Sequence, residues 1–129
     1  MSRLPKKKSR PITVDGRTFR WLLSGSNRYR GKAPVAATIS IQEELEHPGQ
    51  TLQCTAVSNE ALEAPYPSEV ERYGVCKTSI VPSDIEKIIR AGLARGWNPA
   101  EGHGTFHPGN VKLEQYTVTE KEPVHYTFG

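Results

Sequence analysis

Two histidines four residues apart, in the stretch HGTFH, have the residue type and spacing that could bind a metal ion. On one face of a helix, His103 and His107 could both reach a single zinc ion. The surrounding residues exclude a helix at this point: Gly102, Gly104, Pro108 and Gly109. A loop could bring the pair to Glu101, Cys54 or Cys76, but no ligand spacing specifies such a site. We therefore predict no metal site and no cofactor.

The stretch GSNRYRGKA, residues 25–33, contains glycines and a lysine, as phosphate-binding loops do, but it fails their pattern. Five residues separate Gly25 from Gly31 where the motif has four, and Ala33 stands where Ser or Thr would hold the metal. A strand rather than a helix is expected next, so no helix N-terminus would meet the phosphate. We interpret this stretch as a solvated basic loop.

Candidate nucleophiles lack a base that the sequence places beside them. Ser24 and Ser26 lie in a Gly-rich loop without the G-x-S-x-G elbow. Cys76 could pair with His103 or His107 only if the fold brought them together, and a cysteine in an apolar run is usually buried. The carboxylate cluster beside a Pro-Gly turn is interpreted as solvated: Glu43, Glu44 and Glu46. We therefore do not predict an enzyme.

Basic residues are concentrated near the N-terminus. Residues 1–32 contain ten of the 17 Lys and Arg residues and one of the 14 Asp and Glu residues, so this segment carries +9 and the remainder −6. Such a distribution suits RNA or single-stranded DNA, with a tyrosine between two arginines stacking on a base. The candidate nucleic-acid contacts are Arg17, Arg20, Arg28, Tyr29, Arg30 and Lys32. No sequence motif of a known nucleic-acid fold accompanies them.

A long acidic segment, residues 58–74, offers a surface for another protein. Pro65 and Pro67 interrupt any long helix there, and long loops often carry function. Exposed aromatic side chains commonly anchor protein interfaces. The candidate partner contacts are Tyr66, Tyr73 and Trp97, although Trp97 also has a structural explanation in the helix ending described below.

These patterns favour a non-enzymatic binding module whose partner is another protein that the sequence does not identify. The alternative is RNA or single-stranded DNA, bound by the N-terminal arm together with the hairpin and loop Arg17–Lys32. A homodimer formed through an exposed sheet edge is also open. No segment suggests a membrane partner.

The first structured element is expected directly after a basic tail. Pro5 and Pro11 bracket a polar, basic run, so residues 1–11 are predicted to form a flexible arm and residues 12–129 a single α+β domain. In ITVDGRTFRWLL, residues 12–23, Asp15-Gly16 predicts a type I′ hairpin turn. With Val14 opposite Arg17, one face then carries Ile12, Val14, Phe19, Trp21 and Leu23.

Further strands follow by short connections. Residues 35–42 and 50–57 alternate between apolar and polar side chains, which is typical of half-buried strands. Residues 75–81, 111–118 and 122–128 are predicted as additional short strands. Consecutive strands with short connections indicate an antiparallel meander.

One segment, residues 83–95, predicts an amphipathic helix. Ser83 is the expected N-cap, with Glu86 completing a capping box. Gly96 is the expected left-handed residue after the helix, and Trp97 occupies the position where an apolar side chain folds back on the last turn. The predicted fold class is therefore α+β, an antiparallel sheet of about four to five strands with one main α-helix packed on one face. Its predicted core comprises Ile12, Val14, Phe19, Trp21, Ile39, Ile41, Leu52, Ile85, Ile88, Ile89, Leu93 and Trp97.

The size and composition suit one small domain inside the cell. A chain of 129 residues can bury a core without disulfides or metal. No apolar run is long enough to span a bilayer or to form a signal peptide, so we expect a cytoplasmic protein. Cys54 and Cys76 match no redox motif and are expected to be reduced.

Two stretches, ITVDGRTFRW and IVPSDIEKIIRAGLARGWNP, followed by GTF, carry a resemblance across residues 12–106. The chain resembles a group of small uncharacterised bacterial proteins in which a hydrophobic strand precedes a helix that begins with Pro-Ser and ends with Gly-Trp-x-Pro. The resemblance implies a bacterial, cytoplasmic α+β domain, and it implies no activity.

Overall fold

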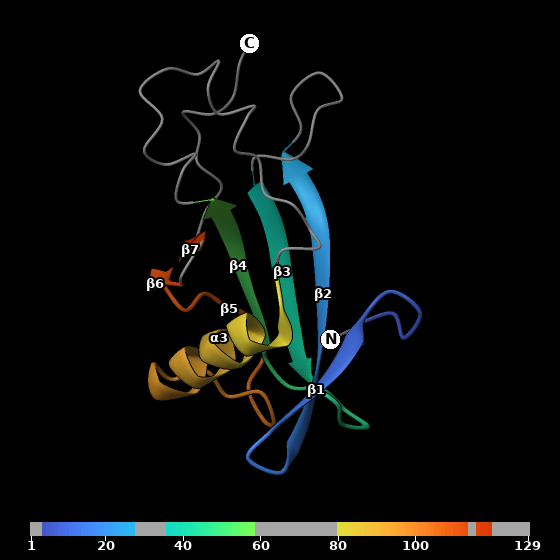
Figure 1. Cartoon of the computed structure of the whole chain (residues 1–129). Coiled ribbons are helices and arrows are strands. Elements are labelled where there is room, and N and C mark those ends of the chain that lie inside the picture. Colours follow the sequence, from blue (N-terminus) through green and yellow to red (C-terminus); the bar gives the residue numbers. More distant parts are fainter. Residues whose placement is uncertain (1–3, 28–35, 59–79, 114–115, 120–129) are drawn as a thin grey trace, which may run out of the picture.

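The computed structural model describes residues 4–27, 36–58, 80–113 and 116–119. It is an α+β fold in which one helix, α3 (Pro82–Ala94), lies across one face of a curled sheet (Figure 1). The sheet has seven strands within these residues, not the four to five that the sequence predicted. The additional strands are only two to four residues long, which is too short for a local pattern to indicate them.

Four longer strands form the predicted antiparallel meander: β1 (Arg10–Val14), β2 (Arg17–Asn27), β3 (Ala36–Glu43) and β4 (Thr51–Ser58). Asp15 and Gly16 both have positive φ, at 52° and 78°, as a type I′ turn requires. Val14 pairs with Arg17, which confirms the predicted hairpin register.

On the edge that does not pair with β3, β4 pairs with two strands at different positions along its length. Near its start, β4 pairs in parallel with β5 (Thr105–Phe106), and near its end it pairs in antiparallel fashion with β7 (Tyr116–Thr119). Strand β6 (Val111–Lys112) then pairs with β7 and forms the outer edge. The prediction of one strand over 111–118 was wrong, because the Leu113 amide donates to the Tyr116 carbonyl at 2.7 Å and the chain reverses there.

Helix α3 begins earlier than predicted. Its N-cap is Val81, and Pro82 occupies the first turn, where a proline needs no hydrogen-bond partner. The Asp84 carboxylate accepts a hydrogen bond from the Val81 amide at 3.2 Å. Asp84 therefore performs the capping that the sequence assigned to Ser83 and Glu86. Residues 75–79 of the predicted preceding strand, and 122–128, lie outside the described residues.

The helix ends as predicted. Gly96 has a φ of 108°, and the Trp97 amide donates to the Gly92 carbonyl at 2.9 Å, which is the longer bond of a Schellman ending. A Cβ on Gly92 would lie 2.5 Å from Leu52 Cδ1, so the glycine lets α3 approach β4 closely. The tight helix ending therefore places Trp97 against the sheet.

The core lies between α3 and the sheet and contains most of the predicted residues. Ten of the twelve are buried, and the other two, Ile12 and Leu93, are partly buried and pack against the core. No helix among the residues that the structure describes has the length and the apolar character needed to cross a membrane.

Candidate functional site

The basic N-terminal segment is folded against the sheet from Leu4 onward. The Pro5 carbonyl accepts hydrogen bonds from the Lys8 amide at 3.3 Å and from the Ser9 amide and hydroxyl at 2.9 and 2.6 Å. Ser9 is buried, and β1 already begins at Arg10. Residues 4–11 of the segment predicted as a flexible arm thus make hydrogen bonds within the fold, while residues 1–3 lie outside the described part.

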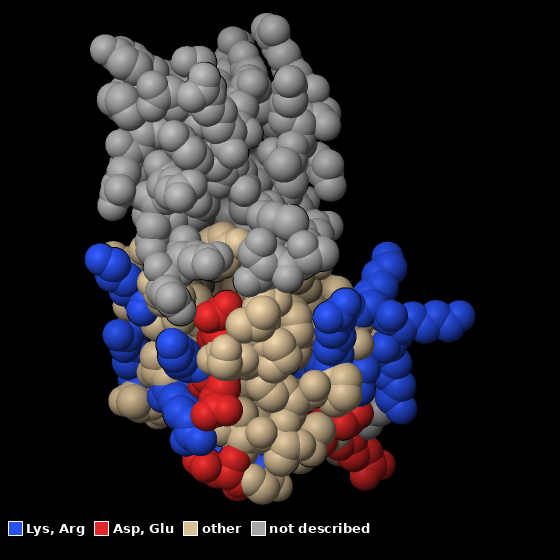
Figure 2. Space-filling model, viewed as in Figure 1, with Lys and Arg blue, Asp and Glu red and all other residues tan. Residues whose placement is uncertain are grey.

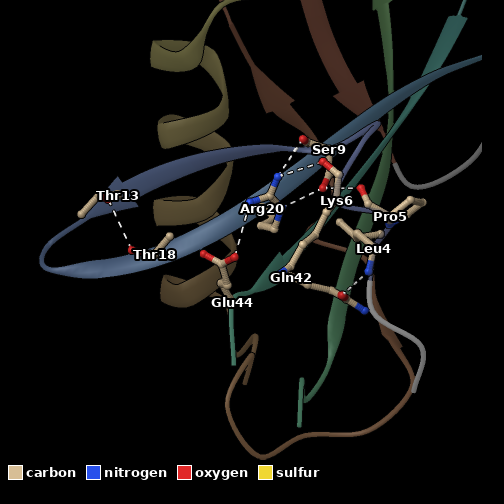
Figure 3. Close-up of polar contacts among 9 residues, drawn as sticks. All are labelled: Leu4, Pro5, Lys6, Ser9, Thr13, Thr18, Arg20, Gln42 and Glu44. Atoms are coloured by element: carbon tan, nitrogen blue, oxygen red, sulfur yellow. Dashed lines mark hydrogen bonds and ion pairs between the residues drawn. The ribbon is translucent and has the colours of Figure 1, made fainter. Parts of the chain in front are cut away.

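Arg20 fastens this segment to the sheet (Figure 3). In β2 it alternates with Phe19 and Trp21, so its side chain points to the sheet face opposite α3. Its Nε donates to Ser9 Oγ at 2.8 Å, and its Nη2 donates to the carbonyls of Ser9 and Lys6 at 2.9 and 3.2 Å. Arg20, one of the predicted nucleic-acid contacts, therefore has only 17% of its side chain exposed and is held by hydrogen bonds within the fold.

Arg17 is also held by a carboxylate. Its Nε and Nη2 donate to the two carboxylate oxygens of Glu43 at 3.0 and 2.7 Å, and its guanidinium lies 5.5 Å from the ring centre of Phe19. Hydrogen bonding to Glu43 raises the pKa of Arg17 above its ordinary value. The structure therefore places this predicted contact in a fork-shaped ion pair that joins β2 to β3.

Trp97, the third predicted partner contact, belongs to the core. Its ring centre lies 5.7 Å from that of Phe19, and its Nε1 donates to the Gln50 carbonyl at 2.8 Å. With 4% of its surface exposed, Trp97 lies in the core, as its predicted place among the core residues implies. The remaining predicted contacts lie outside the described residues: Arg28, Tyr29, Arg30, Lys32, Tyr66 and Tyr73.

The folded N-terminal segment and the β3–β4 connection enclose a pocket with a volume of about 310 Å³, which we call the Glu44 pocket. Three apolar residues line it: Leu4, Leu45 and Pro48. Five charged residues line it as well: Lys6, Arg20, Glu43, Glu44 and Glu46. Its volume is at the lower end of the range for ligand pockets.

Gln42 connects the pocket lining to the segment that covers it. Its Oε1 accepts a hydrogen bond from the Leu4 amide at 2.9 Å, and its Nε2 donates to Thr51 Oγ1 at 2.9 Å. Beside it, Glu44 has 41% of its side chain exposed and lies 3.4 Å from Arg20 Nη1. Four of the residues that line the pocket therefore have side-chain partners within the fold: Arg20, Gln42, Glu43 and Glu44.

Next to the pocket lies a group of exposed cations that we call the basic turn, formed by Lys6, Lys7, Lys8 and Arg10. Arg10, the first residue of β1, shares the sheet face of Ile12 and Val14, and its guanidinium lies 5.8 Å from the ring centre of Trp21. It therefore borders the turn on the α3 side of the sheet, opposite to the side chain of Arg20. Figure 2 shows Lys and Arg atoms on the side where Figure 1 places the N-terminal segment and also on the opposite side, with Asp and Glu atoms beside both groups. Positive and negative groups thus adjoin on this side of the molecule.

Sequence reasoning missed the Glu44 pocket because its two walls lie far apart in the chain. Leu4 and Gln42, which hydrogen bond to each other, are 38 positions apart. The acidic run Glu43–Glu46 was interpreted as a solvated turn, whereas Glu43 is buried and bound to Arg17. The sequence did contain one signal that these two segments could lie together, which is the opposite charge of the basic N-terminus and this acidic run.

The structure describes four of the side chains considered for metal or nucleophilic chemistry: Cys54, Glu101, His103 and His107. His107 Nδ1 lies 3.0 Å from the Gln53 carbonyl oxygen, and His103 is exposed. Among the described residues, no group of three or more His, Cys, Asp and Glu side chains could hold a metal ion. Burial raises the pKa of the Cys54 thiol far above its ordinary value, which keeps it protonated and unreactive, and Cys76 lies outside the described residues.

Comparison with known proteins identifies no relative of this chain. No protein-family model matches it, and no curated protein or solved structure is significantly similar to it. The α+β fold and the surface formed by the Glu44 pocket and the basic turn are therefore the basis for a functional proposal.

Proposed function

We propose that this chain is a non-enzymatic binding domain for another protein and that the Glu44 pocket and the basic turn form its contact surface. The observation that carries the proposal is that positive and negative side chains surround the Glu44 pocket. Protein surfaces interleave both signs of charge with apolar groups, and a partner can match such a pattern residue by residue. The three apolar residues of the pocket offer room for one partner side chain.

The positions of the arginines favour a protein over a nucleic acid. Arg17 and Arg20, two of the six predicted nucleic-acid contacts, are bound to Glu43 and Glu44. These carboxylates would repel a phosphate backbone at the same place. Moreover, no Phe, Tyr or Trp side chain is exposed within the described ranges, so the larger aromatic rings on which bases stack are not presented there.

The surface is also organised before any partner binds. The segment that covers the pocket is held by Arg20 and by the hydrogen bond between Leu4 and Gln42. A surface already fixed by internal hydrogen bonds loses little conformational entropy when it binds. The small loss of conformational entropy supports a recognition role for the surface.

Affinity capture with matched variants tests the proposal. The full chain is immobilised beside Leu45→Glu, which places a charge on the pocket wall, and Val81→Glu, which makes the same kind of change at an exposed residue outside the pocket. Lysate of the source organism, with and without nuclease treatment, is passed over all three at moderate salt. We expect a protein that the wild type and Val81→Glu retain and that Leu45→Glu loses, and we expect the purified protein to bind directly.

Two results would contradict the proposal. One is that all three columns retain the same proteins in the same amounts, because the pocket would then play no part. The other is that the specific capture disappears with nuclease, which would transfer the role to nucleic acid. Thermal unfolding followed by circular dichroism confirms that Leu45→Glu is folded before it is used.

Nucleic-acid binding is the second candidate, and the four exposed cations of the basic turn are the observation that favours it. In this alternative the basic turn acts with the hairpin and loop Arg17–Lys32, of which Arg28–Lys32 lie outside the described residues. Anisotropy of labelled RNA and single-stranded DNA at low and moderate salt tests it, since phosphate contacts give a steep salt dependence.

The proposed setting is a bacterial cytoplasm, as the resemblance to the proteins with the Gly-Trp-x-Pro helix ending implies. That ending corresponds here to Gly96, Trp97 and Pro99, which terminate α3 and bring the indole to the sheet. The ending is part of the core, so we assign it to stability rather than to partner recognition.

A further inference from the structure

We propose that the basic turn, formed by Lys6, Lys7, Lys8 and Arg10, is the docking surface for an acidic segment of the partner protein. The inference rests on the proposed function and adds the chemistry of the partner. Four cations lie within five consecutive residues, and all four are exposed. Lys6 also lines the Glu44 pocket, whereas Arg10 adds its charge from the α3 side of the sheet.

None of these four side chains forms an ion pair within the part of the chain that the structure describes. The ion pairs found there involve other cations, namely Arg17, Arg20 and Arg90. An exposed group of like charges repels itself, so a carboxylate partner would relieve that repulsion as well as add attraction. The basic turn is therefore available to an external anion, whereas Arg17 and Arg20 are already occupied.

The backbone of the turn is fixed, which distinguishes it from a loose basic tail. The Pro5 carbonyl accepts two backbone hydrogen bonds, from Lys8 and Ser9. Arg20 binds the Lys6 and Ser9 carbonyls from the sheet side. The lysine side chains therefore start from defined positions on the surface, and the backbone needs no further ordering when a partner binds.

The neighbouring acidic residues favour a protein segment over a nucleic acid. Lys6 belongs both to the basic turn and to the lining of the Glu44 pocket, so the two signs of charge meet at this residue. A polypeptide can place carboxylates opposite the turn and a basic or apolar side chain opposite the pocket. A nucleic-acid strand carries a phosphate at every nucleotide and would meet Glu44 with the wrong charge.

Peptide binding to the intact protein tests the inference. The probe is a fluorescein-labelled oligo-glutamate peptide, measured by anisotropy, beside an uncharged peptide of equal length and a single-stranded RNA. We compare the wild type with Lys7→Glu/Lys8→Glu. The matched control, Lys87→Glu/Lys112→Glu, makes the same change in net charge at exposed positions on α3 and β6.

We expect the oligo-glutamate peptide to bind the wild type at low salt and to dissociate as salt screens the exposed charges. Charge reversal at Lys7 and Lys8 should weaken this binding roughly tenfold. Each exposed ion pair raises the binding affinity by a factor of roughly two to five, and reversing the charge adds repulsion. The Lys87→Glu/Lys112→Glu control should change it less than about twofold, since these residues lie outside the turn. The uncharged peptide should not bind.

Three results would overturn the inference. The first is no binding of oligo-glutamate at low salt, and the second is an equal loss in both double variants, which would show an effect of net charge alone. The third is RNA that binds more tightly than the peptide and depends on Lys7 and Lys8. If any of these occurs while Leu45→Glu still abolishes capture of a protein, the partner chemistry is wrong and the proposed function stands.

Discussion

Asp15, in the turn of the first hairpin, and Arg90, on helix α3, form a two-pronged ion pair across 75 positions of the chain. Arg90 Nη1 lies 2.9 Å from Asp15 Oδ2, and Nη2 lies 3.2 Å from Oδ1. Glu86, one helical turn before Arg90, accepts a hydrogen bond from its Nε at 3.0 Å. The pair fixes the end of the hairpin to the helix that covers the core.

This pair predicts a pH-dependent contribution to stability. Hydrogen bonding to Arg90 lowers the pKa of Asp15 below its ordinary value, so the contribution is fully present above about pH 4. It is lost as the pH falls through the lowered pKa of the folded state. Asp15→Asn removes the charge and keeps a residue type that accepts the positive φ of the turn.

We expect Asp15→Asn to unfold at a lower urea concentration than the wild type at pH 7 and at nearly the same concentration near pH 2. Because both side chains are exposed, the difference at pH 7 should be small and should shrink further in concentrated salt. A difference that stayed constant from pH 7 to pH 2 would show that the ionised carboxylate is not its cause.

The hydrogen bonds of Arg20 should limit how readily trypsin cleaves after the lysines of the basic turn. Arg20→Gln removes most of the hydrogen bonds that hold the Lys6 and Ser9 carbonyls to the sheet. Hydrogen bonds to charged groups contribute about 1.5–3 kcal/mol each, so local opening should rise by roughly tenfold or more. Trypsin should then cleave after Lys6, Lys7 and Lys8 faster in Arg20→Gln than in the wild type, measured by mass spectrometry of the N-terminal fragments.

Arg17→Gln provides the control for this experiment, because Arg17 binds Glu43 and makes no contact with the N-terminal segment among its hydrogen bonds. Its cleavage after Lys6–Lys8 should match the wild type. Equal acceleration in both variants would indicate global unfolding instead of local release of the segment.

The features that the sequence predicted well are those determined by neighbouring residues. The hairpin register follows from Asp15-Gly16, because a two-residue turn fixes which residues face each other. The end of α3 follows from Gly96, whose left-handed conformation stops the helix and directs Trp97 inward. In both cases the determining residue lies within a few positions of the structure that it specifies.

The features that the sequence missed depend on contacts between distant segments. The N-terminal basic residues were interpreted as a flexible arm, and the acidic run Glu43–Glu46 as a solvated turn. In the structure Arg20 fastens the first segment, and Glu43 and Glu44 of the second bind Arg17 and Arg20. Composition gives the charge of each segment but not the pairing between them, so the candidate site could not be assembled from local patterns.

The start of α3 gives a prediction that separates two capping arrangements. The sequence assigned the cap to Ser83, whereas the structure has the Asp84 carboxylate accepting a hydrogen bond from the Val81 amide. Asp84→Ala should reduce the free energy of unfolding by about 0.5–1 kcal/mol, since it removes this bond and a favourable charge in the first turn. Ser83→Ala, at an exposed position inside the helix, should change it by less than about 0.5 kcal/mol. Urea unfolding of both variants measures the difference, and a larger loss for Ser83→Ala would restore the original assignment.

Pro11 gives the last prediction, which concerns pairing of the sheet edge with a second copy. Strand β1 is at the end of the strand order, and Pro11 lies opposite Arg20. Counting from the two-residue turn, Val14 faces Arg17 in a hydrogen-bonded pair, so position 11 is a non-hydrogen-bonded position whose nitrogen faces outward. A proline there offers no hydrogen-bond donor to another strand and protects the edge.

Pro11→Thr should therefore increase self-association, measured by sedimentation velocity over a concentration series. Thr13→Val, which adds no outward hydrogen-bond donor, should leave self-association unchanged. An unchanged sedimentation coefficient for Pro11→Thr at high concentration would mean that something other than Pro11 keeps the β1 edge unpaired.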